Sequence, residues 1–412
     1  MKLISFEKKL SLPAAISVTV GAVIGVGIFI IVGPIGLKTG GWMPVAFVLA
    51  ALPAIFGTLA SIALGGTIPA DGGGYYYSKS LLGPKAGVVT SYLVMIGALG
   101  AMGTVAVGIA DYFRIYFPDL PRVTVAIGLV LATAAINYLG VMASAWFQIL
   151  MIVQLVSGML IFIVGGIIFG DAPALDQALP AGAGGFAEGT ILAVLCYTGF
   201  NIIGELGDEV ENPRRNIPIT IAAGLGIIIF LYVGMGWVVA GNLSLAELAA
   251  TRVAAVDCAR KFLPPALIHY LNLAAFFAGI TSINAVFLAV PRELVAQAED
   301  GLLPKALLRF DPKRQTFTTA LGLVLAVGVL MLLLDRNPDF YGVICVAGLT
   351  LANAVLSIGA FRLFPRFPEK IAAAEFRITK TWLYPCAAIS AVLSLAVGGF
   401  AVFMLFTEFL LK

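Results

Sequence analysis

Three glycines, at positions 21, 25 and 27, fall inside an apolar run that extends from Leu12 to Leu37. Glycine forms helices poorly, and an unwound stretch in a bilayer leaves backbone N–H and C=O groups without partners. Such groups are tolerated where they line a protein cavity or bind a ligand, as half-helix ends do in transport proteins. The glycines predict a broken helix with a binding site at mid-depth, although Gly21 and Gly25 also fit a small-xxx-small packing face.

The composition defines the class of protein in which this site would lie. Apolar residues make up 60% of the 412 residues and charged residues 11%, whereas soluble domains carry about 25% charged residues. The chain is therefore expected to be an all-α polytopic membrane protein, and it leaves little room for a soluble domain. The net charge of +3 gives no indication of a nucleic acid partner.

Four cysteines, at positions 196, 258, 345 and 386, have no metal-ligand spacing, so we expect neither a metal centre of that kind nor a disulfide framework. The charged segment 1–11 is followed by an apolar run without a small-residue cleavage site. We interpret that run as a retained first helix and not as a signal peptide. The glycine-rich segment 182–185 is expected to be an outer loop, and it lacks the Lys-Ser or Lys-Thr of a phosphate-binding loop.

Apolar runs of about 20 residues predict eleven transmembrane helices within one transporter domain, residues 1–412. We place them at 12–37, 41–66, 85–116, 122–140, 143–170, 187–206, 217–240, 265–297, 316–334, 339–363 and 381–409. With the N-terminus inside the cell, most of the 25 Lys and Arg residues fall in inner segments, as the positive-inside rule requires. The prediction is a multi-pass protein of the plasma membrane with a cytoplasmic N-terminus.

The sixth predicted helix is interrupted as well, at Thr198-Gly199. Breaks in helices one and six imply a five-plus-five inverted repeat, in which two broken helices face each other across a central site. Helices one to five would cover about 12–170, helices six to ten about 187–363, and the helix at about 381–409 would be additional.

Four segments resemble a known family, the amino acid–polyamine–organocation permeases. They are Gly25-Val-Gly-Ile-Phe29, Pro69-Ala-Asp-Gly-Gly-Gly-Tyr75, Glu209 to Pro218, and Pro291-Arg-Glu-Leu to Pro304, and they occur in the family's order. The resemblance implies the inverted-repeat fold, which this family shares with the neurotransmitter:sodium symporters. It also implies transport of amino acids or related amines.

The predicted substrate site follows from the two breaks. Backbone amides of Gly25, Val26 and Gly27 at the positive end of a half-helix suit an α-carboxylate. An α-ammonium could be bound by four backbone carbonyls, those of Val23, Ile24, Tyr197 and Thr198. By resemblance, Phe200 closes over the substrate; the alternative is a packing or lipid-facing phenylalanine.

Side-chain selectivity would come from Thr198 and Asn201, the run Gly97–Met102, and Asn353. No Lys or Arg falls at mid-depth, which favours a neutral amino acid. Three acids lie toward the inner end of helix six: Glu205, Asp208 and Glu209. Asp208 and Glu209 are interpreted as ion-pair partners of the neighbouring basic loop, whereas Glu205 fits a gate, a proton carrier or a partner of helix-end amides.

Proton-coupled members of the resembled family carry a lysine in helix five, where this chain has Gln154 and Leu155 and no lysine between 140 and 170. Helix eight instead resembles the sodium motif of the neurotransmitter:sodium symporters. The resemblance implies a Na⁺ site made by the carbonyls of Gly21, Ile24 and Ala278 and the hydroxyls of Thr281 and Ser282. Neutral oxygens suit a hard cation. Hydroxyls that bond carbonyls of their own helix are the alternative.

The sequence therefore predicts a secondary transporter that imports a neutral amino acid, coupled to Na⁺, with no other cofactor. Proton-coupled or uncoupled amino acid exchange is the alternative within the carrier class. A channel would need a continuous polar pore, and a non-transporting sensor would need a signalling domain; neither is recognisable. An enzyme is disfavoured because no nucleophile–base pair or clustered metal ligands occur.

Overall fold

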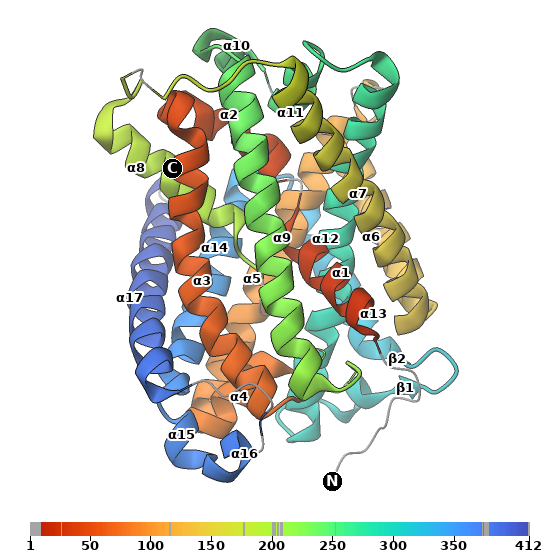
Figure 1. Ribbon diagram of the computed structural model, residues 1–412. Coiled ribbons are helices and arrows are strands. Elements are labelled where there is room, and N and C mark those ends of the chain that lie inside the picture. Colours follow the sequence, from red (N-terminus) through yellow and green to blue (C-terminus); the bar gives the residue numbers. More distant parts are fainter. Residues whose placement is uncertain are drawn as a thin grey trace.

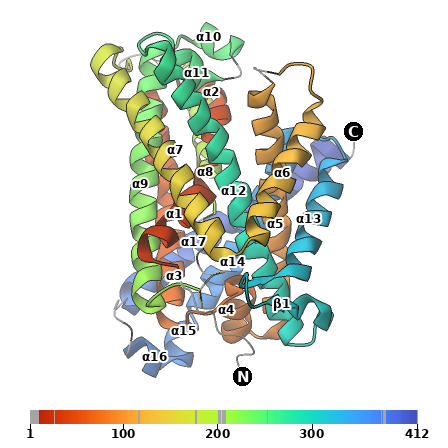
Figure 2. The same ribbon diagram turned by 90° about the vertical axis from the view of Figure 1, so that its right-hand side faces the viewer.

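The computed structural model describes residues 10–25, 27–114, 117–175, 178–199, 203, 206, 209–251, 253–372, 374 and 379–410. Within these ranges the chain is almost entirely helical, with one two-stranded antiparallel hairpin formed by β1 (Phe310–Asp311) and β2 (Thr316–Phe317). Figures 1 and 2 show a bundle in which most long helices run in roughly the same direction. This is the polytopic all-α architecture that the composition predicts.

Each predicted span coincides with a described helix or pair of helices. The helices that correspond to spans one to six are α1 (Leu12–Val23) with α2 (Gly27–Thr39), α3 (Met43–Thr67), α5 (Pro84–Phe113), α6 (Arg122–Tyr138), α7 (Val141–Phe169) and α8 (Gly182–Cys196). Spans seven to eleven are α9 (Pro213–Asn242), α12 (Pro265–Glu299), α13 (Thr318–Leu332), α14 (Pro338–Ala360) and α17 (Lys380–Met404). Among the described residues, seven helical stretches could cross a membrane by length and composition, and three shorter apolar helices accompany them.

The remaining elements are short and cap the two ends of the bundle. One end, here called the α4 end, carries the elements α4 (Gly73–Leu82), α15 (Leu363–Arg366), α16 (Pro368–Ala372) and the β1–β2 hairpin (Figure 1). The opposite end, the α10 end, carries α10 (Leu245–Ala250) and α11 (Ala254–Ala259). Three further single turns are η1 (Gly40–Trp42), η3 (Lys305–Leu308) and the π-turn η4 (Leu405–Leu410).

The helices differ in how deeply they are buried. In its most apolar stretch, α12 is 83% buried inside the protein, whereas α17 is only 28% buried. The outward faces carry large apolar side chains, and Phe169, Trp382 and Trp146 are each more than two-thirds exposed. Contiguous apolar surface of this kind is unfavourable in water and suits lipid. Thus α12 lies at the centre of the bundle and α17 at its periphery.

One expectation about the connections is wrong: segment 182–185 is not an outer loop but the first turn of α8. The close approach of α8 to α2 lies further along the helix, where a Cβ atom at Gly189 would be 2.6 Å from Cγ2 of Thr39. A Cβ atom at Gly182 or Gly184 would meet no atom within 4 Å.

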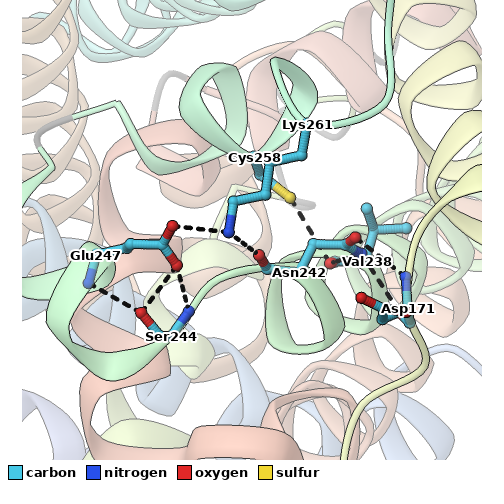
Figure 3. Close-up of polar contacts among 7 residues, drawn as sticks. All are labelled: Asp171, Val238, Asn242, Ser244, Glu247, Cys258 and Lys261. Carbon is cyan, nitrogen blue, oxygen red and sulfur yellow. Dashed lines mark hydrogen bonds and ion pairs between the residues drawn. The ribbon is translucent and has the colours of Figure 1, made fainter.

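A polar network fixes the α10 end (Figure 3). The Lys261 ammonium lies between the Glu247 carboxylate, at 2.7 Å, and the carbonyl of Asn242, at 2.6 Å. Glu247 also forms a capping box with Ser244 at the start of α10. Asn242 joins the end of α9 to the segment after α7, because its Oδ1 accepts the N–H of Asp171 at 3.1 Å.

At the α4 end, α4 is capped by a side chain from another helix. Its N-cap residue, Gly72, is left-handed with φ +64° and has no side chain with which to cap the helix. The buried Glu293 of α12 supplies this function, since its Oε1 accepts the N–H of Tyr75 at 3.1 Å and its other oxygen accepts from the Ser91 hydroxyl. A carboxylate at a helix N-terminus is stabilised by the helix dipole.

Candidate substrate-binding site

The first transmembrane helix is broken where the glycines predict it. Helix α1 ends at Val23, and Ile24 has φ −76° and ψ 77°, the conformation of an inverse γ-turn. The Gly25 N–H closes this turn by donating to the Val23 carbonyl at 2.8 Å. Helix α2 starts anew at Gly27, so its first N–H groups have no hydrogen-bond partners within the helix. The positive end of the α2 helix dipole therefore faces the break.

The carbonyls released at this break are not equivalent. Val23 O accepts the Gly25 N–H and also the Tyr232 hydroxyl, at 3.2 Å. Both acceptor positions of that carbonyl are therefore taken, and binding an ammonium would require one of these bonds to open. Val26, another predicted contact, lies outside the described residues.

The second break lies against the first. Helix α8 ends at Cys196, which places Tyr197 and Thr198 beyond its last turn, and Gly199 is left-handed with φ +110°. A Cβ atom at Gly199 would lie 3.3 Å from the carbonyl oxygen of Ala22. The structure thus brings the predicted segments 23–25 and 197–199 together. Phe200, Asn201, Glu205 and Asp208 lie outside the described residues.

An aromatic cluster supports the second break. The Tyr197 hydroxyl donates to the Phe47 carbonyl at 3.1 Å, and the Tyr197 and Tyr232 rings meet edge to face with centroids 5.1 Å apart. Tyr232 therefore contacts both broken helices. We did not predict a role for it, because one tyrosine in an apolar helix gives no local signal of the direction in which it points.

A cavity of about 170 Å³ adjoins the two breaks and is bounded by α1, α3, α5, α8, α12, α14 and α17. Among the described residues its polar lining consists of Thr58, Tyr197, Thr198, Ser282, Thr350, Asn353 and Ser394, and none of the described lining residues is charged. Asn353 and, from the run 97–102, Ala98 and Ala101 lie on its wall, where we predicted selectivity contacts.

The oxygens of the predicted Na⁺ site also come together. The Ser282 hydroxyl donates to Gly21 O at 2.8 Å and lies 3.2 Å from Ala278 O, and the Thr281 hydroxyl lies 2.8 Å from Ala278 O. These four oxygens are neutral and buried, which fits a hard cation chemically. The same bonds also fit hydroxyls that join α1 to α12 and satisfy helix carbonyls.

A chain of buried amides braces the first half-helix. The Gln148 side chain of α7 donates to Ser17 O at 3.4 Å and to Thr281 O at 3.3 Å, and its oxygen accepts from Asn284 at 2.8 Å. Asn137 of α6 in turn donates to Asn284 at 2.7 Å. Gln148 lies so close to α1 that a Cβ atom at Gly21 would be 2.2 Å from its nitrogen. No local sequence pattern indicates these contacts, since the three amides lie on three different helices.

At the α4 end, Glu209 forms a buried ion pair with a residue of another helix. Its partner is Arg292 of α12, with Nε and Oε1 2.6 Å apart, and the two side chains are 0% and 2% exposed. The backbone of Glu209 also accepts the N–H of Leu10 at 2.6 Å, just before α1. The sequence predicts partners for Glu209 in the neighbouring basic loop, and the structure adds a buried partner from α12.

The comparisons with known proteins agree with this architecture. Residues 10–409 match the family described as amino acid permease. This chain belongs to the amino acid permease family. An uncharacterized transporter of Mycobacterium tuberculosis is 28% identical over 82% of this chain and 76% of its own length. In Bacillus subtilis, a methylthioribose transporter is 26% identical (87% and 81% covered), and a branched-chain amino acid permease is 24% identical (72% and 68% covered).

As a member of this family, the chain is a multi-pass membrane transport protein. The named relatives are permeases and transporters and not enzymes. Within the described part of the chain, no group of three or more His, Cys, Asp or Glu side chains could hold a metal ion.

Proposed function

We propose that this permease is a secondary transporter that imports a neutral amino acid by alternating access. The observation that carries the proposal is the contact between the two helix breaks beside a cavity whose described lining is uncharged. Backbone amides and carbonyls at the breaks would bind the α-carboxylate and α-ammonium, which all amino acids share. A charged side chain would find no described counter-charge on the cavity wall, and burying it unpaired would be costly.

The proposed substrate contacts are those of the breaks: Ile24, Gly25, Val26, Gly27, Tyr197 and Thr198, with Val23 available only when a present hydrogen bond opens. Phe200 and Asn201 remain proposed contacts by resemblance. The relative named as a branched-chain amino acid permease supports a neutral substrate. The relative named as a methylthioribose transporter shows that a chain as similar as this one can carry a different uncharged molecule.

We further propose that the N-terminus lies in the cytoplasm of a cell whose plasma membrane holds the protein, in a single domain with a five-plus-five inverted repeat. The excess of Lys and Arg on the α4 end supports this orientation. Labelling of single cysteines placed in β1–β2 and in α10, in intact cells with an impermeant reagent, tests it. Labelling only in α10 is expected.

The coupling ion proposed is Na⁺, held by Gly21, Ile24, Ala278, Thr281 and Ser282. The gathering of four of these oxygens supports the site. When bound, the cation would connect α1 to α12, so that the position of the first half-helix would depend on whether the ion is bound. Uncoupled exchange is the second candidate, and it is favoured by the hydrogen bonds that already satisfy the same oxygens.

Uptake of a radiolabelled amino acid panel into proteoliposomes, with and without an inward Na⁺ gradient, tests these proposals. Concentrative uptake that needs Na⁺, and loses that dependence in Thr281→Ala and Ser282→Ala, is expected. Ser157→Ala on α7 is a matched control, because its hydroxyl bonds within α7 and to Tyr270 and lies outside the proposed site. Uptake that ignores Na⁺ but needs internal amino acid would replace symport by exchange.

A further inference from the structure

A polar cluster joins α14 to α17 beside the cavity. The Asn353 amide of α14 donates to the Ser390 hydroxyl at 3.2 Å and to the Ser394 hydroxyl at 3.0 Å, both on α17. Ser357 and Ser390 share a further hydrogen bond at 2.9 Å. Helix α3 approaches through Gly57, where a Cβ atom would lie 3.1 Å from the Asn353 nitrogen. Interhelical packing accounts for part of this cluster, since polar residues join helices in membranes.

Packing does not account for where the cluster lies. Asn353 and Ser394 line the same cavity as the helix breaks, together with Thr58 and Thr350, whereas Ser390 does not line it. The cavity therefore has two polar sets of lining residues on different helices. One set, at α1, α8 and α12, belongs to the breaks, and the other is formed by α3, α14 and α17.

The hydrogen bonds of the cluster leave one donor on the cavity wall unused. Asn353 uses both of its amide protons on the two serines, and Ser390 and Ser357, which do not line the cavity, share one hydrogen bond. Ser394 accepts from Asn353, but its own proton has no hydrogen-bond acceptor among the described residues, although the side chain is only 8% exposed. A buried hydroxyl proton without an acceptor is unfavourable, and a ligand in the cavity could supply that acceptor.

We propose that Ser394, oriented by Asn353, recognises the side chain of the substrate and favours neutral amino acids that carry a hydrogen-bond acceptor, a hydroxyl or carboxamide oxygen. This inference rests on the proposed function, in which the breaks bind the α-carboxylate and α-ammonium. Apart from Thr58, Thr350 and Asn353, the nearby wall is apolar, with Ala98, Leu349 and Val397 among its residues, and it accommodates the carbon chain. Helix α17, which lies outside the predicted repeat, thereby contributes to substrate choice.

Competition with isosteric pairs of amino acids tests the proposal, because the two members differ in polarity and hardly in size. In wild-type proteoliposomes the apparent affinity is measured for threonine against valine and for asparagine against leucine. Ser394→Ala should weaken binding of threonine or asparagine, relative to its apolar partner, by about tenfold. Ser394→Thr keeps the hydroxyl and should retain the wild-type ratio, which shows that the site is still folded.

Ser390→Ala is the matched control, since it removes a hydroxyl of the same cluster that does not reach the cavity. Ser390→Ala should change the apparent affinities for the two amino acids of each pair by the same factor. If Ser394→Ala also changed the apparent affinities for both amino acids of a pair by the same factor, the inference would be overturned and Ser394 would be a packing residue. The proposed function would stand. If wild-type protein binds and transports none of the amino acids, the proposed function fails and this inference fails with it.

Discussion

Gly199 lies directly against the backbone of Ala22: a Cβ atom on Gly199 would be 3.3 Å from the Ala22 carbonyl oxygen. The two residues are far apart in the chain. Ala22 lies just before the end of α1, and Gly199 lies just after the end of α8. Their contact means that the peptide groups of both breaks can face one small ligand. It also leaves little room for any side chain at position 199.

Gly199→Ala should therefore impair transport strongly. The residue has φ +110°, which is unfavourable for alanine, and the new methyl group would press on the Ala22 carbonyl. We expect at least a tenfold loss of uptake in proteoliposomes with the protein still monodisperse in detergent. Gly226→Ala on α9 is the control, because that glycine has no atom within 4 Å of an added Cβ. Normal uptake by Gly199→Ala would contradict the close contact of the breaks.

The buried pair of Glu209 and Arg292 should matter for stability at the α4 end. Replacing Arg292 by Met removes the buried cation that pairs with the Glu209 carboxylate, and breaking a buried ion pair in this way typically costs about 3–5 kcal/mol of unfolding free energy. The exposed pair Lys38–Glu188 is the control, and Lys38→Met should cost no more than about 1 kcal/mol. Denaturant unfolding in mixed micelles measures both variants. Similar costs for the two would argue against burial of the Glu209 pair.

The α10 end should be insensitive to pH in the physiological range. The hydrogen bond from Lys261, with those from Ser244, lowers the pKa of the Glu247 carboxyl to about 2. An acid with a lowered native-state pKa stabilises the fold at pH values above its unfolded pKa of about 4.3, and that stabilisation disappears as the pH falls toward 2. Glu247 should thus stay charged and paired at every pH from 5 to 8.

Hydrogen exchange of segment 244–261 measures this expectation. After correction for the intrinsic pH dependence of exchange, protection in the wild type should be constant between pH 5 and 8. The Glu247→Gln variant should show lower protection than the wild type at each pH, because a neutral amide binds the Lys261 ammonium less strongly than a carboxylate does. A step in wild-type protection near pH 6 or 7 would show that another group controls this cap.

A large part of the fold follows from local sequence, because lipid requires each spanning segment to be long, apolar and helical. Hydropathy located ten of the eleven predicted helices to within a few residues, whereas the sixth, placed at 187–206, corresponds to α8, which ends at Cys196. The glycines located the first break, between the end of α1 at Val23 and the start of α2 at Gly27. Local composition failed at 182–185, where the glycine-rich segment forms the first turn of α8 and not a loop.

What only the tertiary structure decided is which side chains meet. Tyr232, Gln148 and Ser394 are single polar residues in apolar helices, and no local pattern indicates which of them faces the breaks, the half-helix or the cavity. Arg292 could likewise not be assigned to Glu209 before α12 was placed beside it. Hydropathy fixes each helix as a unit along the chain, but the rotation and neighbours of a helix depend on packing with segments distant in sequence, and these determine its polar partners.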